Sequence, residues 1–396
     1  MPPLGRDTVV GILGAGAMGS GIAQVAAPAG HRVLVRDVDE DAARRAVHNM
    51  GKALDNQVAK RKLSSDAAAK ILERVDVVSG GSGNLTSLAD CGLVIEAIVE
   101  NLEIKQRTFK ELEEVVDTSC VLATNTSSLS VTAIAKACEH PERVIGIHFF
   151  NPAVVLPLVE IVPGVATSPE VTKNVRAFVE GWGKTTVVAS DTPGFIVNRI
   201  ARPFYGEALR IHEEGIADPA TIDWAMRELG GFRMGPFELM DFIGNDVNLA
   251  ATTAVFEGTN FDARYRPSVT QQRLAAAGQL GRKTGRGHYD YAEGAVKPEP
   301  LKDEILGERI LKRILSMLIN EAAEAVHYGI GSAADIDLAM TKGVNYPKGL
   351  LAWGNELGLD KVVDTIESLR AEYEEERYRP SPLLKRMVRE GRRFHE

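Results

Sequence analysis

The 396-residue sequence is poor in cysteine, has no excess of positive charge and contains no long apolar run. Its three cysteines, Cys91, Cys120 and Cys138, are an odd number and lack the paired spacing of a metal site. They predict neither a disulfide nor a zinc site. Their apolar neighbours favour a place in the core of a protein from a reducing compartment.

Charge and hydropathy argue against two further classes. The 46 Lys and Arg residues against 54 Asp and Glu give a net charge of -8, which opposes attraction to a phosphate backbone, so nucleic acid is not an expected partner. No apolar run approaches the roughly 20 residues that span a bilayer. The first ten residues lack the charged-then-apolar pattern of a signal segment. We therefore expect no membrane association and a cytoplasmic location.

The chain is long enough, at 44% hydrophobic residues, to bury a large core in two or three domains. Up to residue 190, short apolar runs alternate with helical stretches, the pattern of a sheet built from βαβ units. The runs cover residues 8–13, 32–37, 75–79, 93–98, 121–126, 143–150, 158–162 and 185–190. Their nearly continuous apolar character predicts a mostly parallel sheet, buried on both faces, in an α/β domain over residues 1–190.

After residue 190 helical periodicity replaces the strand-like runs, and this helical part occurs twice. A shift of 114 residues brings the glycines at 215, 235 and 244 onto those at 329, 349 and 358. The pentapeptide RYRPS occurs at 264–268 and again at 377–381. We predict two copies of one all-α domain, at 191–291 and 297–396, joined by the charged, proline-containing stretch at 292–304.

A glycine-rich motif follows the first strand-like run and leads into a helical stretch. Its residues are Gly14, Ala15, Gly16, Ala17, Met18 and Gly19. This is the G-x-G-x-x-G pattern that places a pyrophosphate at a helix N-terminus. Asp37 closes the next run 18 residues after Gly19, where a carboxylate accepts a ribose 2′-hydroxyl. The domain is therefore predicted to be of the Rossmann type with NAD as cofactor, while Arg36 keeps NADP open as the alternative.

A histidine and a glutamate suggest the chemistry. His148 lies near the end of the sixth run, and Glu160 lies within the apolar seventh run, where a carboxylate needs a partner. An imidazole held by this carboxylate at one nitrogen leaves the other to take a proton from an alcohol while hydride passes to a nicotinamide. The alternative is a histidine with a purely structural hydrogen bond.

Seven motifs occur in order over about residues 7 to 291: GAGAMGSGIAQ, VIEAIVENLEIK, ATNTSSLSVTAIA, HFFNP with LVEIV, DTPGFIVNR, MGPFELMDFIG and GRKTGRGHYDY. Together they resemble the (S)-3-hydroxyacyl-CoA dehydrogenases, and the repeat resembles a second copy of that family's C-terminal domain. ARPFYGEALR, the repeat and RYRPS are most similar to the bacterial branch of phenylacetate catabolism, which uses 3-hydroxyadipyl-CoA. The resemblance implies NAD-dependent oxidation of a 3-hydroxyacyl-CoA to a 3-oxoacyl-CoA, as in fatty acid β-oxidation, with 3-hydroxybutyryl-CoA as the other candidate substrate.

The resemblance also implies roles for single residues. His148 becomes the general base and Glu160 the residue that orients it, with Ser127 and Asn198 as substrate-binding hydrogen-bond donors near the reacting oxygens. Cofactor contacts are implied at Glu100, Lys105, Asn151 and Lys283, and contacts with the CoA phosphates at Lys60, Arg61 and Lys62.

Each of these positions also has a plainer interpretation. Ser127, or its neighbours Ser128 and Ser130, suits a helix N-cap, and Asn198 suits a turn between domains. Glu100 and Lys105 suit a surface ion pair. The basic residues 60–62 suit a solvated helix end.

The chain departs from the family pattern at several positions. Val154 and Pro157 replace a proline and a lysine between the two catalytic residues, which affects the edge of the acyl pocket. His288 stands in the final motif, where GFY is usual. Lys312 occupies the place of Asn198 in the second helical copy, which should therefore have no active site.

Two other functions and two assembly states stay open. A 3-hydroxy-acid dehydrogenase of the 6-phosphogluconate type shares the nucleotide motif but uses a lysine as its proton carrier. A non-catalytic binding protein on the same fold is the second alternative. The chain is expected to be a homodimer, or a monomer whose two helical copies form a pseudo-twofold contact.

Overall fold

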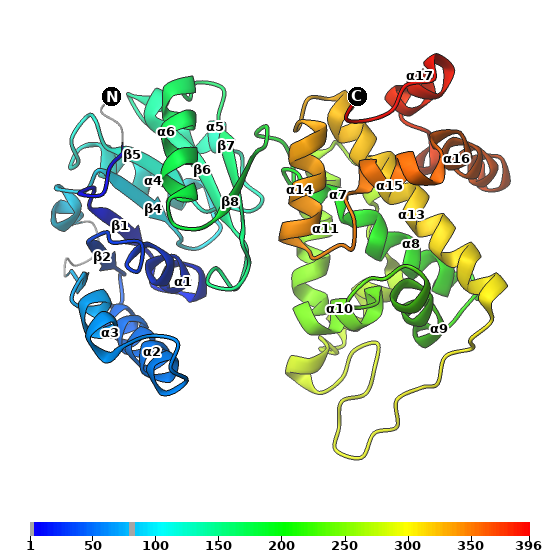
Figure 1. The fold of residues 1–396 in the computed structure, drawn as a ribbon, viewed down its shortest axis with the longest axis horizontal. Helices are drawn as coiled ribbons and strands as arrows, with labels where there is room; N and C mark the ends of the chain where they lie inside the picture. The colour runs from blue at the N-terminus through cyan, green and yellow to red at the C-terminus, as the bar shows by residue number, and fades with distance from the viewer. Residues whose placement is uncertain (1–3, 79–83) are drawn as a thin grey trace. The chain divides into compact units, whose positions relative to one another are not determined.

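The computed structural model describes residues 4–78 and 84–396 and forms two units, one up to Asp191 and one from Thr192 onward (Figure 1). Ser79, the last residue of the third predicted strand, lies outside the described residues. The first unit holds the strands and the second is helical. Among the helices of the described residues, none has both the length and the apolar character needed to cross a bilayer.

The first unit is built on one sheet with the strand order β3-β2-β1-β4-β5-β6-β7-β8. The strands are β1 (Val10–Leu13), β2 (Val33–Arg36), β3 (Val75–Val77), β4 (Leu93–Glu96), β5 (Val121–Thr124), β6 (Val144–Phe149), β7 (Leu158–Pro163) and β8 (Thr185–Val188). Every predicted run therefore contains a strand. The helices are α1 (Ala17–Ala26), α2 (Glu40–Ala59), α3 (Ser65–Leu72), α4 (Leu102–Glu113), α5 (Val131–Ala135) and α6 (Pro169–Glu180).

Burial on both faces of the sheet is confirmed. Along β4, Leu93 and Ile95 belong to one core cluster while Val94 belongs to the other. Because successive side chains point to opposite faces, the two clusters lie on the two sides of the sheet. Cys91 and Cys120 fill the second cluster, as expected for buried free thiols.

The last two strands run against the first six. β6 pairs antiparallel with β7, and β7 pairs parallel with β8. Only residues 150–157 connect β6 to β7, which is too short for the crossover of a dozen or more residues that a parallel neighbour needs. This reversal places residues of β6 and β7 directly opposite each other.

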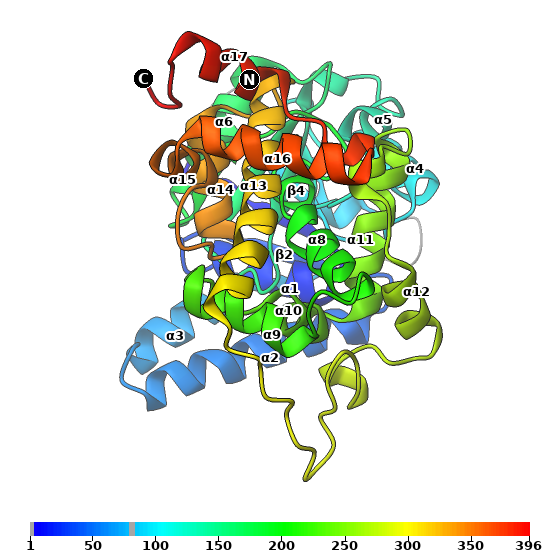
Figure 2. The same cartoon turned by 90° about the vertical axis from the view of Figure 1, so that its right-hand side faces the viewer.

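The second unit is all-helical. Its helices are α7 (Val197–Ile200), α8 (Arg202–Glu213), α9 (Pro219–Trp224), α10 (Pro236–Ile243), α11 (Asn245–Gly258), α12 (Val269–Ala276), α13 (Glu304–His327), α14 (Ala333–Gly343), α15 (Leu350–Leu357), α16 (Leu359–Tyr373) and α17 (Pro382–Glu390). Figures 1 and 2 both show α13 running alongside α8.

The predicted repeat is confirmed by equivalent helix caps. Asp223 accepts two backbone N–H groups of the first turn of α10, both at 2.9 Å. Asp337, its counterpart at the 114-residue shift, accepts two N–H groups of the first turn of α15 at 2.8 and 3.0 Å. A Cβ at Gly235 would lie 2.3 Å from Asp223, and one at Gly349 would lie 2.4 Å from Asp337. The glycines are needed because each carboxylate occupies the space of a side chain.

The two copies meet through a pair of matched contacts. Glu207 of the first copy bonds to Arg313 of the second at 2.9 Å, and Glu321 of the second bonds to Arg199 of the first at 2.9 Å. Both partners are related by the same 114-residue shift. This exchange is the pseudo-twofold contact predicted within one chain.

Candidate active site

The glycine-rich turn connects β1 to α1, and its three glycines meet different structural requirements. Gly14 has a φ of +104°, and a Cβ there would lie 2.5 Å from the carbonyl oxygen of Ala97. A Cβ at Gly19 would lie 1.8 Å from the carbonyl oxygen of Gly14. The fold therefore requires both of these glycines.

Gly16 is different because a Cβ there would meet no atom within 4 Å. It stands at the N-cap of α1 without a side-chain cap, so open surface faces the N–H groups of the helix start. This surface allows the close approach of a phosphate group to the backbone, as a bound NAD requires. The residues present therefore fit the cofactor.

Asp37 lies directly beside this turn, as its spacing predicts. Its Oδ2 accepts the backbone N–H of Ala15 at 2.6 Å, and its Oδ1 accepts that of Asp39 at 3.0 Å. Arg36 is only 2% exposed, and burial is the main cause that lowers the pKa of its guanidinium. A buried guanidinium is poorly placed to receive the 2′-phosphate of NADP, which weighs against that alternative.

His148 and Glu160 face each other across the antiparallel pair of β6 and β7. The imidazole Nδ1 lies 2.7 Å from Glu160 Oε2. Glu160 is fully buried and His148 is 5% exposed. The structure thus brings the two predicted residues into one hydrogen-bonded pair, and the Phe150 ring lies against the imidazole with ring centroids 4.5 Å apart.

Ser127 belongs to a segment held by Glu100. One oxygen of that carboxylate accepts the hydroxyls of Thr126 and Ser128 and the backbone N–H groups of Ser127 and Ser128. Burial alone would raise the pKa of Glu100, but the charge of Lys105 and these hydroxyls outweigh it and lower the pKa below its ordinary value. Glu100 is therefore held as a carboxylate.

The hydroxyl of Ser127 is not a helix cap. Ser130 is the N-cap of α5 and accepts the N–H of Ala133 at 3.1 Å. Within the described residues the Ser127 hydroxyl makes no hydrogen bond. The capping interpretation of Ser127 is therefore wrong, and its hydroxyl is available to a ligand.

Glu96 is a site residue that the sequence analysis missed. It ends β4, is completely buried, and accepts bonds from Lys105 Nζ at 2.5 Å, Thr124 Oγ1 at 2.8 Å and the N–H of Ile98 at 2.7 Å. Lys105 is itself only 1% exposed and lies 3.3 Å from Glu100. The expectation of a surface pair between Glu100 and Lys105 is therefore wrong. The lysine instead joins two carboxylates beneath the Ser127 segment.

These side chains share one edge of the sheet. The strand order reverses between β1 and β4, with β2 and β3 on one side and β5 and β6 on the other. The glycine turn, Asp37, Glu96 and Ser127 follow or end β1, β2, β4 and β5, and His148 lies near the end of β6. In open α/β sheets, ligands bind outside the carboxyl ends of the strands at such a switch point.

The loop between β6 and β7 is fixed by a lysine from outside it. Lys184 Nζ donates to the carbonyl oxygens of Ala153 and Leu156. Within this loop Asn151 and Val154 are exposed, and the carbonyl oxygen of Pro157 accepts the N–H of Thr185 at 2.9 Å. The departures from the family pattern therefore lie in an ordered loop, and the pairing of His148 with Glu160 is kept.

Residues 60–62 follow the end of α2. All three side chains are exposed, and Arg61 has a φ of +55°. This is the geometry of a solvated helix end, and it also leaves the three cations accessible to an anionic ligand.

Asn198 and Lys283 belong to the second unit. Asn198 lies on α7, and its carboxamide makes no hydrogen bond within the described part of the chain, so it does not satisfy nearby backbone. Lys283 Nζ lies 2.6 Å from Asp246 Oδ1, and both side chains are well exposed.

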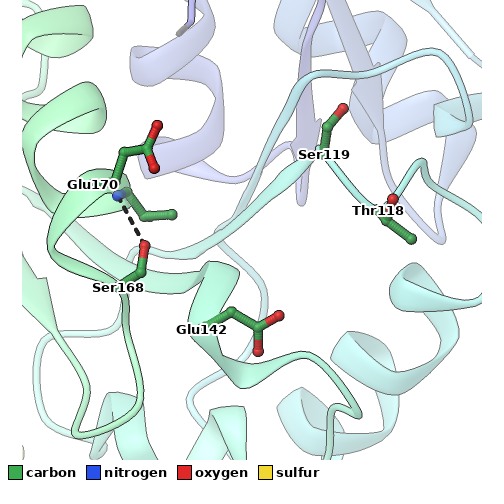
Figure 3. A pocket seen from close by; sticks show the side chains of 6 residues that line it. Thr118, Ser119, Glu142, Ser168 and Glu170 are labelled. Carbon is green, nitrogen blue, oxygen red and sulfur yellow. Dashed lines mark hydrogen bonds between the residues drawn. The ribbon is translucent and has the colours of Figure 1, made fainter. Parts of the chain in front are cut away.

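A pocket of about 330 Å³ in the first unit lies elsewhere. Thr118, Ser119, Glu142, Ser168, Glu170 and Val171 line it (Figure 3). Thr118 and Ser119 precede β5, Glu142 precedes β6, and the Ser168 hydroxyl caps the start of α6 at Val171 N–H, 3.1 Å away. This pocket therefore sits at the amino ends of β5 and β6, away from the candidate site. No group of three or more potential metal ligands occurs in residues 4–78 and 84–396.

Comparison with known families matches both units. The sequence model for "3-hydroxyacyl-CoA dehydrogenase, NAD binding domain" matches residues 9–192. The model for "3-hydroxyacyl-CoA dehydrogenase, C-terminal domain" matches twice, at residues 194–291 and 310–394. The α/β domain followed by two copies of one helical domain is thereby confirmed.

The chain is similar to relatives of different lengths. A 3-hydroxyadipyl-CoA dehydrogenase of Escherichia coli is 38% identical over 95% of this chain and 96% of its own length. A 3-hydroxybutyryl-CoA dehydrogenase of Bradyrhizobium diazoefficiens is 42% identical over 74% of this chain and 98% of its own length. A solved structure of 3-hydroxybutyryl-CoA dehydrogenase from Escherichia coli has a TM-score of 0.90 at 37% identity and covers 96% of this chain and 98% of that one.

Proposed function

This chain belongs to the 3-hydroxyacyl-CoA dehydrogenase family, and we propose that His148 and Glu160 carry out the proton transfer of its NAD-dependent oxidation. The observation that carries this proposal is the 2.7 Å contact between His148 Nδ1 and Glu160 Oε2. Membership of this family also excludes the alternative of a 3-hydroxy-acid dehydrogenase of the 6-phosphogluconate type.

The pair is suited to act as a base. Glu160 holds Nδ1 and so fixes the ring, which assigns Nε2 as the nitrogen that receives the proton of the C3 hydroxyl. As the proton arrives, the carboxylate stabilises the imidazolium that forms. NAD, when bound, accepts the hydride that leaves C3, and the product is a 3-oxoacyl-CoA.

The remaining residues have supporting roles in the proposal. Ser127 and Asn198 donate hydrogen bonds to the substrate oxygens, and both lack a side-chain partner within the described residues. Asp37 and residues 14–19 bind the adenosine half and the pyrophosphate of NAD. Contacts with the cofactor are proposed for Glu100, Lys105, Asn151 and Lys283, and a contact with the CoA phosphates for Arg61.

The substrate we propose is 3-hydroxyadipyl-CoA, with 3-hydroxybutyryl-CoA as the second candidate. The first is supported by the relative that matches both helical copies, and the second by relatives of about three quarters of this length and by the name of the Escherichia coli structure. Initial rates on acyl-CoAs from C4 to the C6 dicarboxylate test the choice.

Domain limits and location complete the proposal. We propose domains at 1–190, 191–291 and 297–396, supported by the family matches at 9–192, 194–291 and 310–394. The free cysteines suit a reducing compartment, so we also propose that the chain works in the cytoplasm. Cell fractionation tests this location.

The proposed base is tested by His148→Gln. The variant should lower kcat by about 10²- to 10⁴-fold and leave NADH binding nearly unchanged, and Glu160→Gln should act in the same direction. His140→Gln is the matched control because that histidine is exposed in the same unit. Near-normal turnover of His148→Gln would assign the base to another residue, and an inactive unmodified protein would favour the non-catalytic alternative.

A further inference from the structure

Asn198 sits on an unusually short helix. α7 has four residues, and α8 begins at Arg202 with Pro203 in its first turn. A proline has no N–H to bond the carbonyl four residues earlier, so α7 does not continue as a regular helix into α8. At the 114-residue shift Met317 replaces the proline, and the second copy has the continuous 24-residue helix α13. The backbone at Asn198 therefore needs support from outside its own helix.

Part of that support comes from Arg202 of α8, whose Nε donates to the Asn198 carbonyl oxygen at 2.6 Å, and part comes from the second helical copy. Arg199, the next residue after Asn198, is buried, and its Nε donates to Glu321 Oε1 at 2.9 Å. The Tyr265 hydroxyl donates to the same oxygen. Glu321 lies on α13 and is 1% exposed. α7 is thus fixed by a buried, charge-assisted hydrogen bond to the other copy.

The second copy also contacts the first-copy chain just before α7, at Ile196. A Cβ on Gly331 would lie 2.9 Å from Cδ1 of Ile196, the N-cap residue of α7. The segment before α14 therefore packs closely against the start of α7. Residues of the second copy therefore contact the short helix at its N-cap residue and at Arg199.

The equivalent contact, between Glu207 of the first copy and Arg313 of the second, does not hold a helix that carries a proposed site residue. Glu207 is also 1% exposed, bonds to Arg313 at 2.9 Å and accepts the Tyr378 hydroxyl at 3.0 Å. The residue before Arg313 is Lys312, the counterpart of Asn198, and it is exposed within α13. The two glutamates share burial and a matched arginine and tyrosine, although Glu207 also bonds to Arg210 of its own copy at 2.9 Å. Only Glu321 holds the helix of a proposed site residue.

We propose that Glu321 is a positioning residue for Asn198, acting through Arg199. The second helical copy then contributes to the active site although it has no nucleotide domain and no asparagine of its own. The inference rests on the proposed role of Asn198 as a hydrogen-bond donor to the substrate. It gives the repeat a function in catalysis in addition to covering apolar surface.

The matched pair of glutamates provides the experiment. Glu321→Gln and Glu207→Gln each remove one buried carboxylate from a matched contact with an arginine and a tyrosine of the other copy, so both should lower Tm. Only Glu321→Gln should lower kcat, by about tenfold, with the KM for NAD unchanged. Equal effects of the two variants on kcat would overturn the proposal.

Two less disruptive variants, each at a tyrosine, test the proposal if the glutamate variants fail to fold. Tyr265→Phe removes one hydrogen bond to Glu321, and Tyr378→Phe removes the equivalent bond to Glu207. We expect kcat to fall roughly threefold in Tyr265→Phe and to stay unchanged in Tyr378→Phe. The same kcat in both variants would contradict the positioning role.

A double-mutant cycle separates this inference from the proposed function. Asn198→Ala alone should lower kcat by about 10- to 100-fold, but by less than about threefold in the Glu321→Gln background, where Asn198 is already displaced. If both single variants lower kcat and their effects are additive, the inference fails while the role of Asn198 stands. If Asn198→Ala alone leaves kcat unchanged, the proposed role of Asn198 and the inference fail together.

Discussion

Two buried side-chain pairs at the carboxyl edge of the sheet, His148 with Glu160 and Lys105 with Glu96, differ in how far the sequence predicts them. A glutamate inside the apolar run 158–162 predicted a partner for His148, and register places the two directly opposite each other. Glu96 also lies in an apolar run, and the same rule applied there would have found it. Its partner Lys105 lies nine residues further on, on α4, which packs back over the strand end.

The sequence predicts the presence of a buried charge better than its partner. Spacing along the chain suggested Glu100 for Lys105, but the structure gives this lysine two carboxylates and removes it from solvent. The carboxylate that pairs with Lys105 is determined by how α4 packs in the tertiary structure. A single sequence contains no local signal for that packing. Buried pairs of this kind are costly to break because each leaves an uncompensated charge.

Cofactor choice is a prediction at the scale of one residue. Asp37→Ala should raise the KM for NAD by about tenfold or more and narrow the preference over NADP, because the ribose hydroxyls lose their acceptor and a 2′-phosphate meets less repulsion. Initial rates with both cofactors measure this. Asp39→Ala is the control, since the exposed Asp39 side chain caps α2 and pairs with Arg45. Equal use of NAD and NADP by the unmodified protein would refute the assignment.

At the scale of elements, the apolar runs predicted where strands form but not their directions. The reversal of β7 follows from the short connection at 150–157, a length that the sequence displays and that implies an antiparallel neighbour. The helix break between α7 and α8 is likewise visible at Pro203. Its consequence for Asn198 depends on α13, which follows about a hundred residues later in the chain.

The final motif packs on α10 through His288, and this contact gives a pH dependence. The imidazole lies against Phe237 with ring centroids 4.8 Å apart. Burial lowers the pKa of His288 to about 4, with Asp241 opposing this shift and His212 adding to it. The folded state therefore favours the neutral ring, whereas the unfolded chain binds a proton near pH 6.5.

Stability from this histidine should be complete above about pH 6.5 and should be lost as the pH falls toward 4. The loss amounts to about 3 kcal/mol when complete. His288→Phe removes the ionisable group, so its free energy of unfolding should fall less between pH 7 and pH 4.5 than that of the unmodified protein. Urea denaturation at both pH values measures the difference. His48→Gln, an exposed histidine, should show the unmodified dependence, and identical losses in all three proteins would disprove this account.

At the scale of the whole chain, the repeat was evident from the sequence but the meeting faces were not. Aromatic rings of the first copy lie against those of the second: Phe232 against Tyr346 at 5.0 Å and against Trp353 at 5.8 Å between ring centroids. Glu207 and Arg199 obtain their buried partners from the second copy as well. The first copy alone would therefore expose apolar rings, leave Arg199 without its carboxylate and leave Glu207 with Arg210 as its remaining partner.

Truncation after Tyr291 tests whether this face associates with a second chain. The shortened chain corresponds in extent to relatives such as the Bradyrhizobium diazoefficiens protein, which matches 74% of this chain over nearly its whole length. Since Arg313 and Glu321 are the counterparts of Arg199 and Glu207, a second truncated chain offers the same groups to the exposed face. We therefore expect the shortened chain to dimerise, or to aggregate through its apolar face.

Light scattering on the full and shortened chains measures the difference. In a dimer of shortened chains, Arg199 of one protomer would pair with Glu207 of its partner, so Glu207→Gln should weaken that dimer, while Asp39→Ala in the first unit should leave it unchanged. The full chain carries both halves of the contact and should keep its mass when Glu207 is substituted. A shortened chain that stays monomeric, soluble and fully active would show that the second copy neither covers an associating face nor supports Asn198.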